Sequence, residues 1–250
     1  ITPRNVGNLE VAWTYRTGDM RGQPGDPVET TFQVTPLKIG DRLFLCTPHQ
    51  FVIALDATTG EEIWRYDPDI RGALALQHLT CRGLSYHASA AAADTAADTA
   101  APTGATPSSP GSPPDGEIRT SSIGLPVAAE GASVVEDCPA KLFMPTADGR
   151  LIALDPESGA VCRGFGGGRG QIDLWANMPH ADPGGYYSTS PVVVTDRLIV
   201  VGGTVLDNVS TTEPSGVIRA FDVDTGALVW NWDPGRPDET APIDPGETYV

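Results

Sequence analysis

The sequence predicts an all-β fold that forms part of a β-propeller, and three observations lead to this prediction. A phrase occurs three times, in which an apolar strand ends in Ala-hydrophobic-Asp-x-x-Thr/Ser-Gly, at Phe51–Gly60, Leu151–Gly159 and Val217–Gly226. A second strand follows, with a tryptophan in the outer two copies, Trp64 and Trp230. Gly (28) and Pro (23) make up about a fifth of the chain, which suits many turns and argues against a helical bundle.

Each copy is expected to form an antiparallel meander, because its turn residues suit tight connections. The Asp of the phrase can cap the turn with its side chain, and the Gly can adopt a positive φ. A strand also precedes each copy, clearly at Thr35–Leu45 and Ser190–Val200 and more weakly at Lys141–Met144. The middle copy is degenerate, with Arg163 at the position of the tryptophan.

The spacing of the copies fits propeller blades. Asp56, Asp155 and Asp222 are separated by 99 and 67 residues, and 44 residues of the longer interval belong to a segment at 88–131 rich in Ala, Thr, Ser, Pro, Gly and Asp. We expect this segment to be a surface insertion that is mostly disordered, since it has almost no large apolar residues before Ile118. Without it the intervals are 55 and 67 residues, somewhat above the ~40–50 of common propeller repeats.

Three such units cannot close a ring, so we interpret the chain as a fragment of one larger domain, with blades in 1–87 and in 132–250. A β-sandwich is the alternative, and it accounts for alternating strands but not for the repeated phrase. The Trp-x-aromatic strands at Trp13, Trp64 and Trp230 are expected to pack between blades rather than to bind a ligand.

Charge excludes some classes of partner. The chain has 16 basic and 32 acidic residues, a net charge of −16. Such a surface repels nucleic-acid phosphates and disfavours adsorption on anionic lipid. No run of the sequence approaches the roughly 20 apolar residues of a membrane-spanning helix.

The cysteines indicate no metal or redox motif. Cys46, Cys81, Cys138 and Cys162 form no C-x-x-C pair, so neither a zinc ribbon nor a thioredoxin-like site is supported. Two readings remain open, buried thiols or one disulfide if the protein is exported. For Cys46, which ends the apolar run Leu43–Cys46, a buried thiol is favoured.

Several stretches of the sequence resemble a known family. The stretch Ala54–Trp64 (Ala-Leu-Asp-Ala-Thr-Thr-Gly-Glu-Glu-Ile-Trp) resembles the tryptophan-docking repeat of pyrroloquinoline quinone (PQQ) dehydrogenases. Four further stretches resemble the membrane-bound glucose/quinate/shikimate branch of this family: Val11–Asp19, Val34–Gln50, Gln77–His87 and Ser210–Arg219. The resemblance covers the whole chain except 88–131, and the Gln77–His87 phrase is its most specific part.

The resemblance implies a location and an activity. It implies the first blades of an eight-bladed quinoprotein propeller on the periplasmic face of the bacterial inner membrane, anchored by membrane helices that this chain lacks. It implies oxidation of an aldose or cyclic polyol with PQQ, D-glucose to gluconolactone first and quinate or shikimate as the alternative, with electrons passing to ubiquinone. The catalytic aspartate base of the family lies in a later blade, outside this chain.

The resemblance also assigns cofactor-binding residues. It places Arg16 near PQQ, His78 over the quinone ring face, and Arg82 on a carboxylate or the quinone oxygens, where a planar guanidinium suits an anion. Gln33 stands where the family often has Glu; its amide can donate a hydrogen bond but carries no charge. Thr189 matches a position whose hydroxyl touches a PQQ carboxylate.

The pair Asp207–Asn208 is associated in this branch with the divalent metal that polarises the quinone carbonyl. Their hard oxygen donors suit Mg²⁺ or Ca²⁺. From the residues alone, ordinary roles stay open: surface ion pairs for Arg16 and Arg82, a loop histidine for His78, and an Asx turn for the metal pair.

The remaining histidines, His49, His87 and His180, are assigned to no constellation, and no P-loop or Ser-His-Asp phrase appears. Two rivals to the leading interpretation remain. One is a non-catalytic propeller scaffold with tryptophan repeats. The other is the soluble PQQ alcohol dehydrogenase branch, which carries adjacent cysteines beside the cofactor, and no two cysteines are adjacent here.

Overall fold

The computed structural model describes residues 2–70, 74, 77–89, 132–176, 184–205, 214 and 216–233. In these ranges one 3-10 turn at Val6–Asn8 is the only helical element, and all other elements are strands. None of the described helices is long and apolar enough to cross a bilayer. The prediction of an all-β fold is therefore confirmed.

Two four-stranded antiparallel sheets have the same strand order, and they correspond to the outer copies of the repeat. The first sheet runs β2-β3-β4-β5, with strands at Leu37–Ile39, Arg42–Cys46, Val52–Asp56 and Glu62–Tyr66. The third sheet runs β14-β15-β17-β18, with strands at Val193–Val194, Leu198–Val201, Ile218–Asp222 and Leu228–Trp232. Both are the meanders that the sequence predicts.

The second sheet is more elaborate than the predicted meander. It runs β7-β9-β10-β11-β8, and β12 also pairs with β10; the strands are Ser85–Ala88, Ala140–Pro145, Arg150–Leu154, Val161–Cys162, Val134–Val135 and Gln171–Asp173. Its outer strand β11 has two residues and is followed by Arg163, and β8 pairs with it in parallel. Ala88, the first residue of the predicted insertion, is the last residue of β7 and pairs with Ala140 of β9. Residues 90–131 lie outside the described residues.

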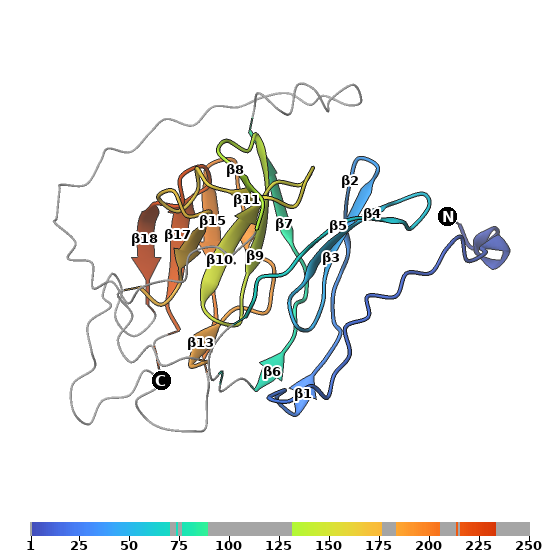
Figure 1. The fold of residues 1–250 in the computed structure, drawn as a ribbon, viewed down its shortest axis with the longest axis horizontal. Coiled ribbons are helices and arrows are strands. Elements are labelled where there is room, and N and C mark those ends of the chain that lie inside the picture. The colour runs from blue at the N-terminus through green and yellow to red at the C-terminus, as the bar shows by residue number, and fades with distance from the viewer. Residues whose placement is uncertain are drawn as a thin grey trace.

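The second sheet lies between the other two. Along β10, Leu151 and Ala153 belong to the apolar core shared with the third sheet. Ile152 and Leu154 belong to the core shared with the first sheet. This period of two is that of a strand buried on both faces. Figure 1 shows the three sheets side by side, blue, then green to yellow, then orange to red.

The last two strands of the two outer sheets pair in the same register. Trp64 pairs with Ala54, and Trp230 pairs with Ala220, with a register shift directly after each alanine. The sequence prediction that these indoles occupy equivalent positions is therefore confirmed.

Tryptophans dock on the Asp-to-Gly turn of the next repeat. Trp64 Nε1–H donates to the Pro156 carbonyl at 3.1 Å, and Trp13 Nε1–H donates to the Ala57 carbonyl at 3.3 Å. Gly60 and Gly159 have positive φ (76° and 72°). A Cβ there would lie 2.5 Å from Trp13 and 2.6 Å from Trp64. Glycine is thus required for both backbone conformation and close packing.

Two tryptophans differ from what the sequence predicts for them. Trp230 is 38% exposed, since no turn of the described residues covers it. Trp13 was expected in a strand, yet its segment forms no strand with the residues that the structure describes. The third turn is contacted by Phe165 and by Gly166, whose N–H donates to the Thr225 carbonyl at 2.8 Å.

Four short strands form two further pairs at one end of the sheets. β1 (Glu29–Thr30) and β6 (His78–Leu79) pair in parallel, and β13 (Tyr186–Tyr187) and β16 (Thr204–Val205) pair antiparallel. In Figure 1, β1, β6 and β13 lie together at the lower edge. The loops at this end carry most of the predicted site residues.

All four cysteines are in disulfides, Cys46–Cys81 and Cys138–Cys162. The prediction of a free buried thiol at Cys46 is wrong. Cys46 is fully buried at the end of β3, where the loop after β6 passes with 5.8 Å between the two Cα atoms. Local sequence could not separate the two readings, because burial is the same for both and the partner is 35 residues away.

Candidate functional site

The loop 77–84, which carries His78 and Arg82, runs as the middle of three adjacent segments. On one side it pairs with β1, and farther along the Thr35 N–H donates to the Arg82 carbonyl at 2.9 Å. On the other side the Arg82 N–H donates to the Thr189 carbonyl at 2.8 Å. The Cys46–Cys81 disulfide fastens the same loop to the end of β3. Residues far apart in the chain are thereby brought into one group.

Arg82 contacts two other predicted site residues directly. Its Nε–H donates to Gln33 Oε1 at 2.9 Å, and its Nη1 donates to Thr189 Oγ1 at 2.7 Å. A guanidinium has five N–H donors, so Nη2 and the second Nη1–H keep donor capacity with respect to the described residues. Arg82 is exposed, which leaves these donors accessible to an anion.

A hollow of about 320 Å³ adjoins Thr189. Most of its lining residues are serine, threonine or glycine, and one is apolar: Ser188, Thr189, Ser190, Gly202, Gly203, Thr204, Gly216 and Ile218. This volume lies at the small end of the range for small-molecule sites, roughly 300–1,000 Å³. Neutral donors beside a guanidinium form a setting suited to carboxylate groups.

His78 is fixed by two residues that the sequence analysis did not single out. Its Nδ1 lies 2.5 Å from Glu29 Oε2, across the β1–β6 pairing. Its backbone N–H donates to the Tyr187 hydroxyl at 3.4 Å. Burial raises the pKa of Tyr187 above its ordinary 10.0, so the phenol stays protonated at neutral pH. Strands of two residues give no periodicity, so sequence patterns could not reveal the pairing.

Arg16 is not brought into this group. It is exposed, and in the part of the chain that the structure describes it makes no hydrogen bond or ion pair. Its neighbours Tyr15 and Thr17 are held instead by Arg65 of β5, at 2.9 and 3.2 Å from Nη2. Its predicted role stays a prediction.

The predicted metal ligands, Asp207 and Asn208, lie outside the described residues. Within the described ranges, no three His, Cys, Asp or Glu side chains are grouped so that they could hold a metal ion.

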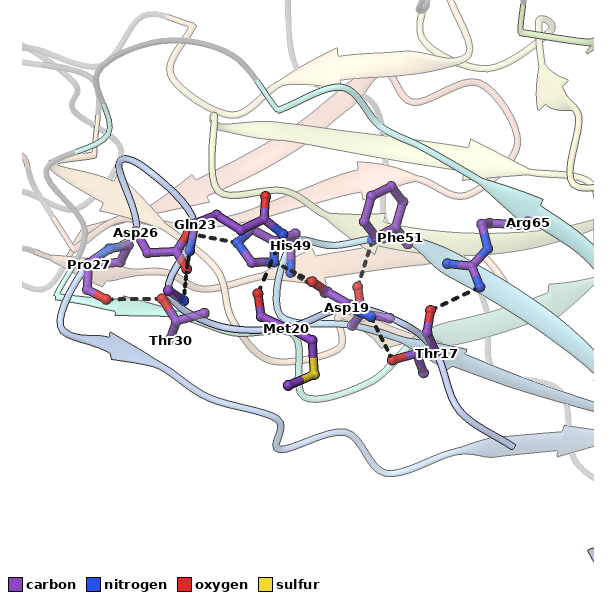
Figure 2. Close-up of polar contacts among 12 residues, drawn as sticks. Thr17, Asp19, Met20, Gln23, Asp26, Pro27, Thr30, His49, Phe51 and Arg65 are labelled. Atoms are coloured by element: carbon purple, nitrogen blue, oxygen red, sulfur yellow. Dashed lines mark hydrogen bonds and ion pairs between the residues drawn. The ribbon is translucent and has the colours of Figure 1, made fainter. Parts of the chain in front are cut away.

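The expectation that His49 has no constellation is wrong, because the structure places it between two carboxylates (Figure 2). Its Nδ1 contacts Asp19 Oδ1, and its Nε2 lies 2.7 Å from Asp26 Oδ1. The Asp19 side chain is fully buried, and the His49 side chain is 17% exposed. The partners are 30 and 23 residues away, which explains why no local motif indicated them.

His49 and Asp26 shift each other's pKa in opposite directions. Burial alone would lower the pKa of His49, but its contacts with Asp26 and Asp19 raise it above the ordinary 6.5. Burial would likewise raise the pKa of Asp26, but hydrogen bonds from His49 and from the Gln23 and Gly22 N–H groups lower it below 3.8. Both shifts favour an imidazolium between two carboxylates.

Comparison with known proteins gives one family match over the whole chain. Residues 1–250 match the family described as "PQQ: Glucose/ethanol/alcohol dehydrogenase, beta-propeller domain". The Escherichia coli (strain K12) quinoprotein glucose dehydrogenase is 44% identical over 96% of this chain and 26% of its own length. The Acinetobacter calcoaceticus quinoprotein glucose dehydrogenase A is 41% identical over 100% of the chain and 27% of its own length.

Two further relatives bear on specificity and fold. The quinate/shikimate dehydrogenase (quinone) of Acinetobacter baylyi is 35% identical over 100% of this chain and 27% of its own length. A solved europium-containing methanol dehydrogenase superimposes with a TM-score of 0.55 at 22% identity, over 98% of this chain and 30% of that one. The chain thus spans about a quarter of the length of its curated relatives, and the solved structure supports the propeller fold.

Proposed function

Since the chain belongs to the PQQ glucose/ethanol/alcohol dehydrogenase β-propeller family, we propose that the complete protein is a quinoprotein dehydrogenase that oxidises an aldose, D-glucose to gluconolactone first. Identities of 44% and 41% to two glucose dehydrogenases favour this substrate over quinate or shikimate, at 35%. Oxidation of quinate or shikimate is the second candidate. A non-catalytic propeller scaffold is the alternative.

The observation that carries the proposal is the hydrogen-bonded group of Arg82, Gln33 and Thr189 beside the hollow that adjoins Thr189. PQQ is a flat quinone with three carboxylates, so it needs a cation and several neutral donors. Arg82, Thr189 and the Gln33 amide supply both, and Arg16 would add a second cation from the neighbouring segment. When bound, PQQ supplies a two-electron oxidant for the substrate alcohol.

His78 has a definable role beside this group. When its Nδ1–H donates to Glu29, the neutral ring presents Nε2 as a hydrogen-bond acceptor. An acceptor at this position can orient a hydroxyl of a sugar. The role that we propose for the His78–Glu29 pair is therefore orientation of the substrate.

For the metal, we keep Asp207 and Asn208 as the proposed ligands of Mg²⁺ or Ca²⁺, on the chemistry of their oxygen donors. A divalent ion there would act as a Lewis acid towards a carbonyl oxygen.

The disulfides support an extracytoplasmic location. Both pairs, Cys46–Cys81 and Cys138–Cys162, are of the kind that persists in oxidising compartments such as the bacterial periplasm. We therefore propose that the protein lies on the periplasmic face of the inner membrane, with ubiquinone as electron acceptor.

The test uses the complete apo-protein. PQQ binding is measured by isothermal titration calorimetry, and the loaded protein is then assayed with glucose, quinate and shikimate at equal concentrations. PQQ binding together with preferential glucose oxidation is the expected result. Preference for quinate or shikimate would move the assignment to the second candidate, and an absence of PQQ binding would favour the scaffold.

A further inference from the structure

The hairpin turn that carries His49 departs from its counterpart in the second sheet. The equivalent turns are Thr47–Gln50 and Thr146–Gly149, each closed by a backbone hydrogen bond to its threonine carbonyl. The second turn ends in Asp148-Gly149, the expected chemistry for a residue with φ of 76°. The first ends in His49-Gln50, and Gln50 adopts a φ of 68° without being glycine. A non-glycine residue at this φ is energetically unfavourable, so we attribute its presence to contacts that the side chains of the turn make.

Both side chains of this turn are used for long-range contacts. Gln50 is buried, and its Oε1 accepts a hydrogen bond from the Ala147 N–H at 2.8 Å, which joins the two turns. His49 contacts Asp19 and Asp26 (Figure 2). Asp19 is held twice, since its Oδ2 also accepts the His49 backbone N–H at 2.9 Å.

The end of the β3–β4 hairpin that carries Cys46 and His49 holds two segments of the candidate site, the loop 77–84 and the segment 19–33. Cys46 is bonded covalently to Cys81, which lies between His78 and Arg82. His49, three residues after Cys46, holds the segment 19–26, which leads directly into β1 and Gln33. The loop 77–84 is thus attached by a disulfide, and the segment 19–33 is attached by an ionic contact.

We propose that His49 is a positioning residue: as an imidazolium clamped between Asp19 and Asp26, it fixes the segment 19–33 against the loop 77–84. It thereby sets Glu29 against His78 and Gln33 against Arg82. The inference rests on the proposed function in one respect, that this loop binds the cofactor.

The geometry requires a charged ring. Both ring nitrogens face carboxylate oxygens, and only an imidazolium can donate to both. Among the described residues, the charged groups that face His49 are Asp19 and Asp26, both on the 17–27 segment; its own turn contributes the uncharged Gln50. A neutral ring would direct a lone pair at one of the carboxylates, and that contact would be lost.

The sign of the pH dependence follows from the two shifts. The pKa of His49 is raised, so its contribution is complete below pH 6.5 and is lost as the pH rises through the raised value. The pKa of Asp26 is lowered, so its contribution is complete above pH 3.8 and is lost as the pH falls through the lowered value. At alkaline pH the segment 19–33 should therefore loosen, while the loop 77–84 stays attached by its disulfide.

Hydrogen exchange of the complete apo-protein, read by mass spectrometry on peptides covering 17–33, tests this directly. With exchange times scaled for the intrinsic pH dependence, wild-type protection should fall about tenfold or more between about pH 6 and pH 9, as two charge-assisted hydrogen bonds are weakened. His49→Gln should show the low protection at every pH. Asp26→Asn should lose protection at a lower pH than wild type, because one carboxylate no longer supports the charged ring.

The matched control is His87→Gln, because burial lowers the pKa of His87, and this histidine of β7 should leave the 17–33 profile unchanged. PQQ affinity measured by calorimetry should fall over the same alkaline range in wild type and lose this dependence in His49→Gln. The proposal is overturned if wild-type protection of 17–33 is constant across the range, or if His49→Gln and wild type exchange alike. The exchange result does not involve PQQ, so it stands apart from the test of the proposed function.

Discussion

Glu29 and His78 lie opposite each other across the parallel β1–β6 pairing, with 2.5 Å between Glu29 Oε2 and His78 Nδ1. Their side chains are 58% and 41% exposed, so solvent screens the pair, and its free energy in this chain alone is modest. Its importance is directional, since the carboxylate determines which ring nitrogen carries the proton and which is presented to a ligand.

Glu29→Ala should therefore affect turnover rather than folding. In the complete PQQ-loaded enzyme we expect kcat to fall by about two- to fivefold, as for a partly exposed pair, with thermal stability unchanged. Glu29→Gln should recover part of the loss, because the amide oxygen still accepts from Nδ1–H. Steady-state kinetics over a pH series are the measurement. Unchanged kcat and an unchanged pH profile in both variants would contradict the orienting role.

Arg82→Ala should weaken cofactor binding. A charge-assisted hydrogen bond contributes about 1.5–3 kcal/mol, so the PQQ concentration for half saturation should rise by at least about tenfold. Arg82→Lys should restore only part of the affinity, since an ammonium lacks the planar fork that reaches Gln33 and Thr189 together. Arg163→Ala is the control, because Arg163 forms an exposed ion pair with Glu136. Equal PQQ titrations of Arg82→Ala and this control would refute the assignment.

The two disulfides should separate stability from binding. Removing either pair, as Cys46→Ala/Cys81→Ala or Cys138→Ala/Cys162→Ala, should destabilise the protein by about 2–5 kcal/mol and lower its melting temperature. Only the first double variant should also weaken PQQ binding, because Cys81 lies in the loop that carries His78 and Arg82. In Figure 1, the strands β8 and β11 next to the second disulfide lie at the opposite end of the sheets from β6. Equal loss of PQQ affinity in both variants would show that the effect is global.

The docking of Trp64 on Gly159 can be measured with a matched pair of glycine variants. Gly159→Ala should cost at least about 2 kcal/mol, because it adds backbone strain and a clash with the indole. Gly40→Ala serves as the reference, since Gly40 also has a positive φ (55°) but has nothing within 4 Å of the added Cβ. Thermal unfolding of the complete protein gives both values. If the two variants unfold alike, the indole contributes nothing beyond the turn itself.

Asp207→Ala tests the proposed metal ligand. We expect the Mg²⁺ or Ca²⁺ concentration needed for half-maximal activity of the complete enzyme to rise by about tenfold or more, as a carboxylate ligand is lost. The circular dichroism spectrum of the apo-protein should not change. An unaltered metal titration would reduce Asp207 to a turn residue.

The sequence predicted the features that are local. The three Asp-to-Gly turns and the alternating strands beside them depend on residues within a few positions of each other, and the two outer sheets form as expected. Arg163 at the tryptophan position correctly indicated a weaker middle copy, since β11 has only two residues.

Contacts between distant segments were not accessible in this way. The disulfide partner of Cys46, the carboxylates around His49 and the Glu29–His78 contact all depend on how blades and loops are placed together. The resemblance named Gln33, Arg82 and Thr189 as site residues, but their direct contacts, over separations of 49 and 107 residues, emerged from the fold.

The docking of Trp13 and Trp64 on turns made later in the chain sets an order of assembly. Trp13 needs the turn that ends at Gly60, and Trp64 needs the one that ends at Gly159. During synthesis each of these two indoles therefore stays uncovered until the following repeat has been made, and over that interval it is an apolar surface prone to association with other chains.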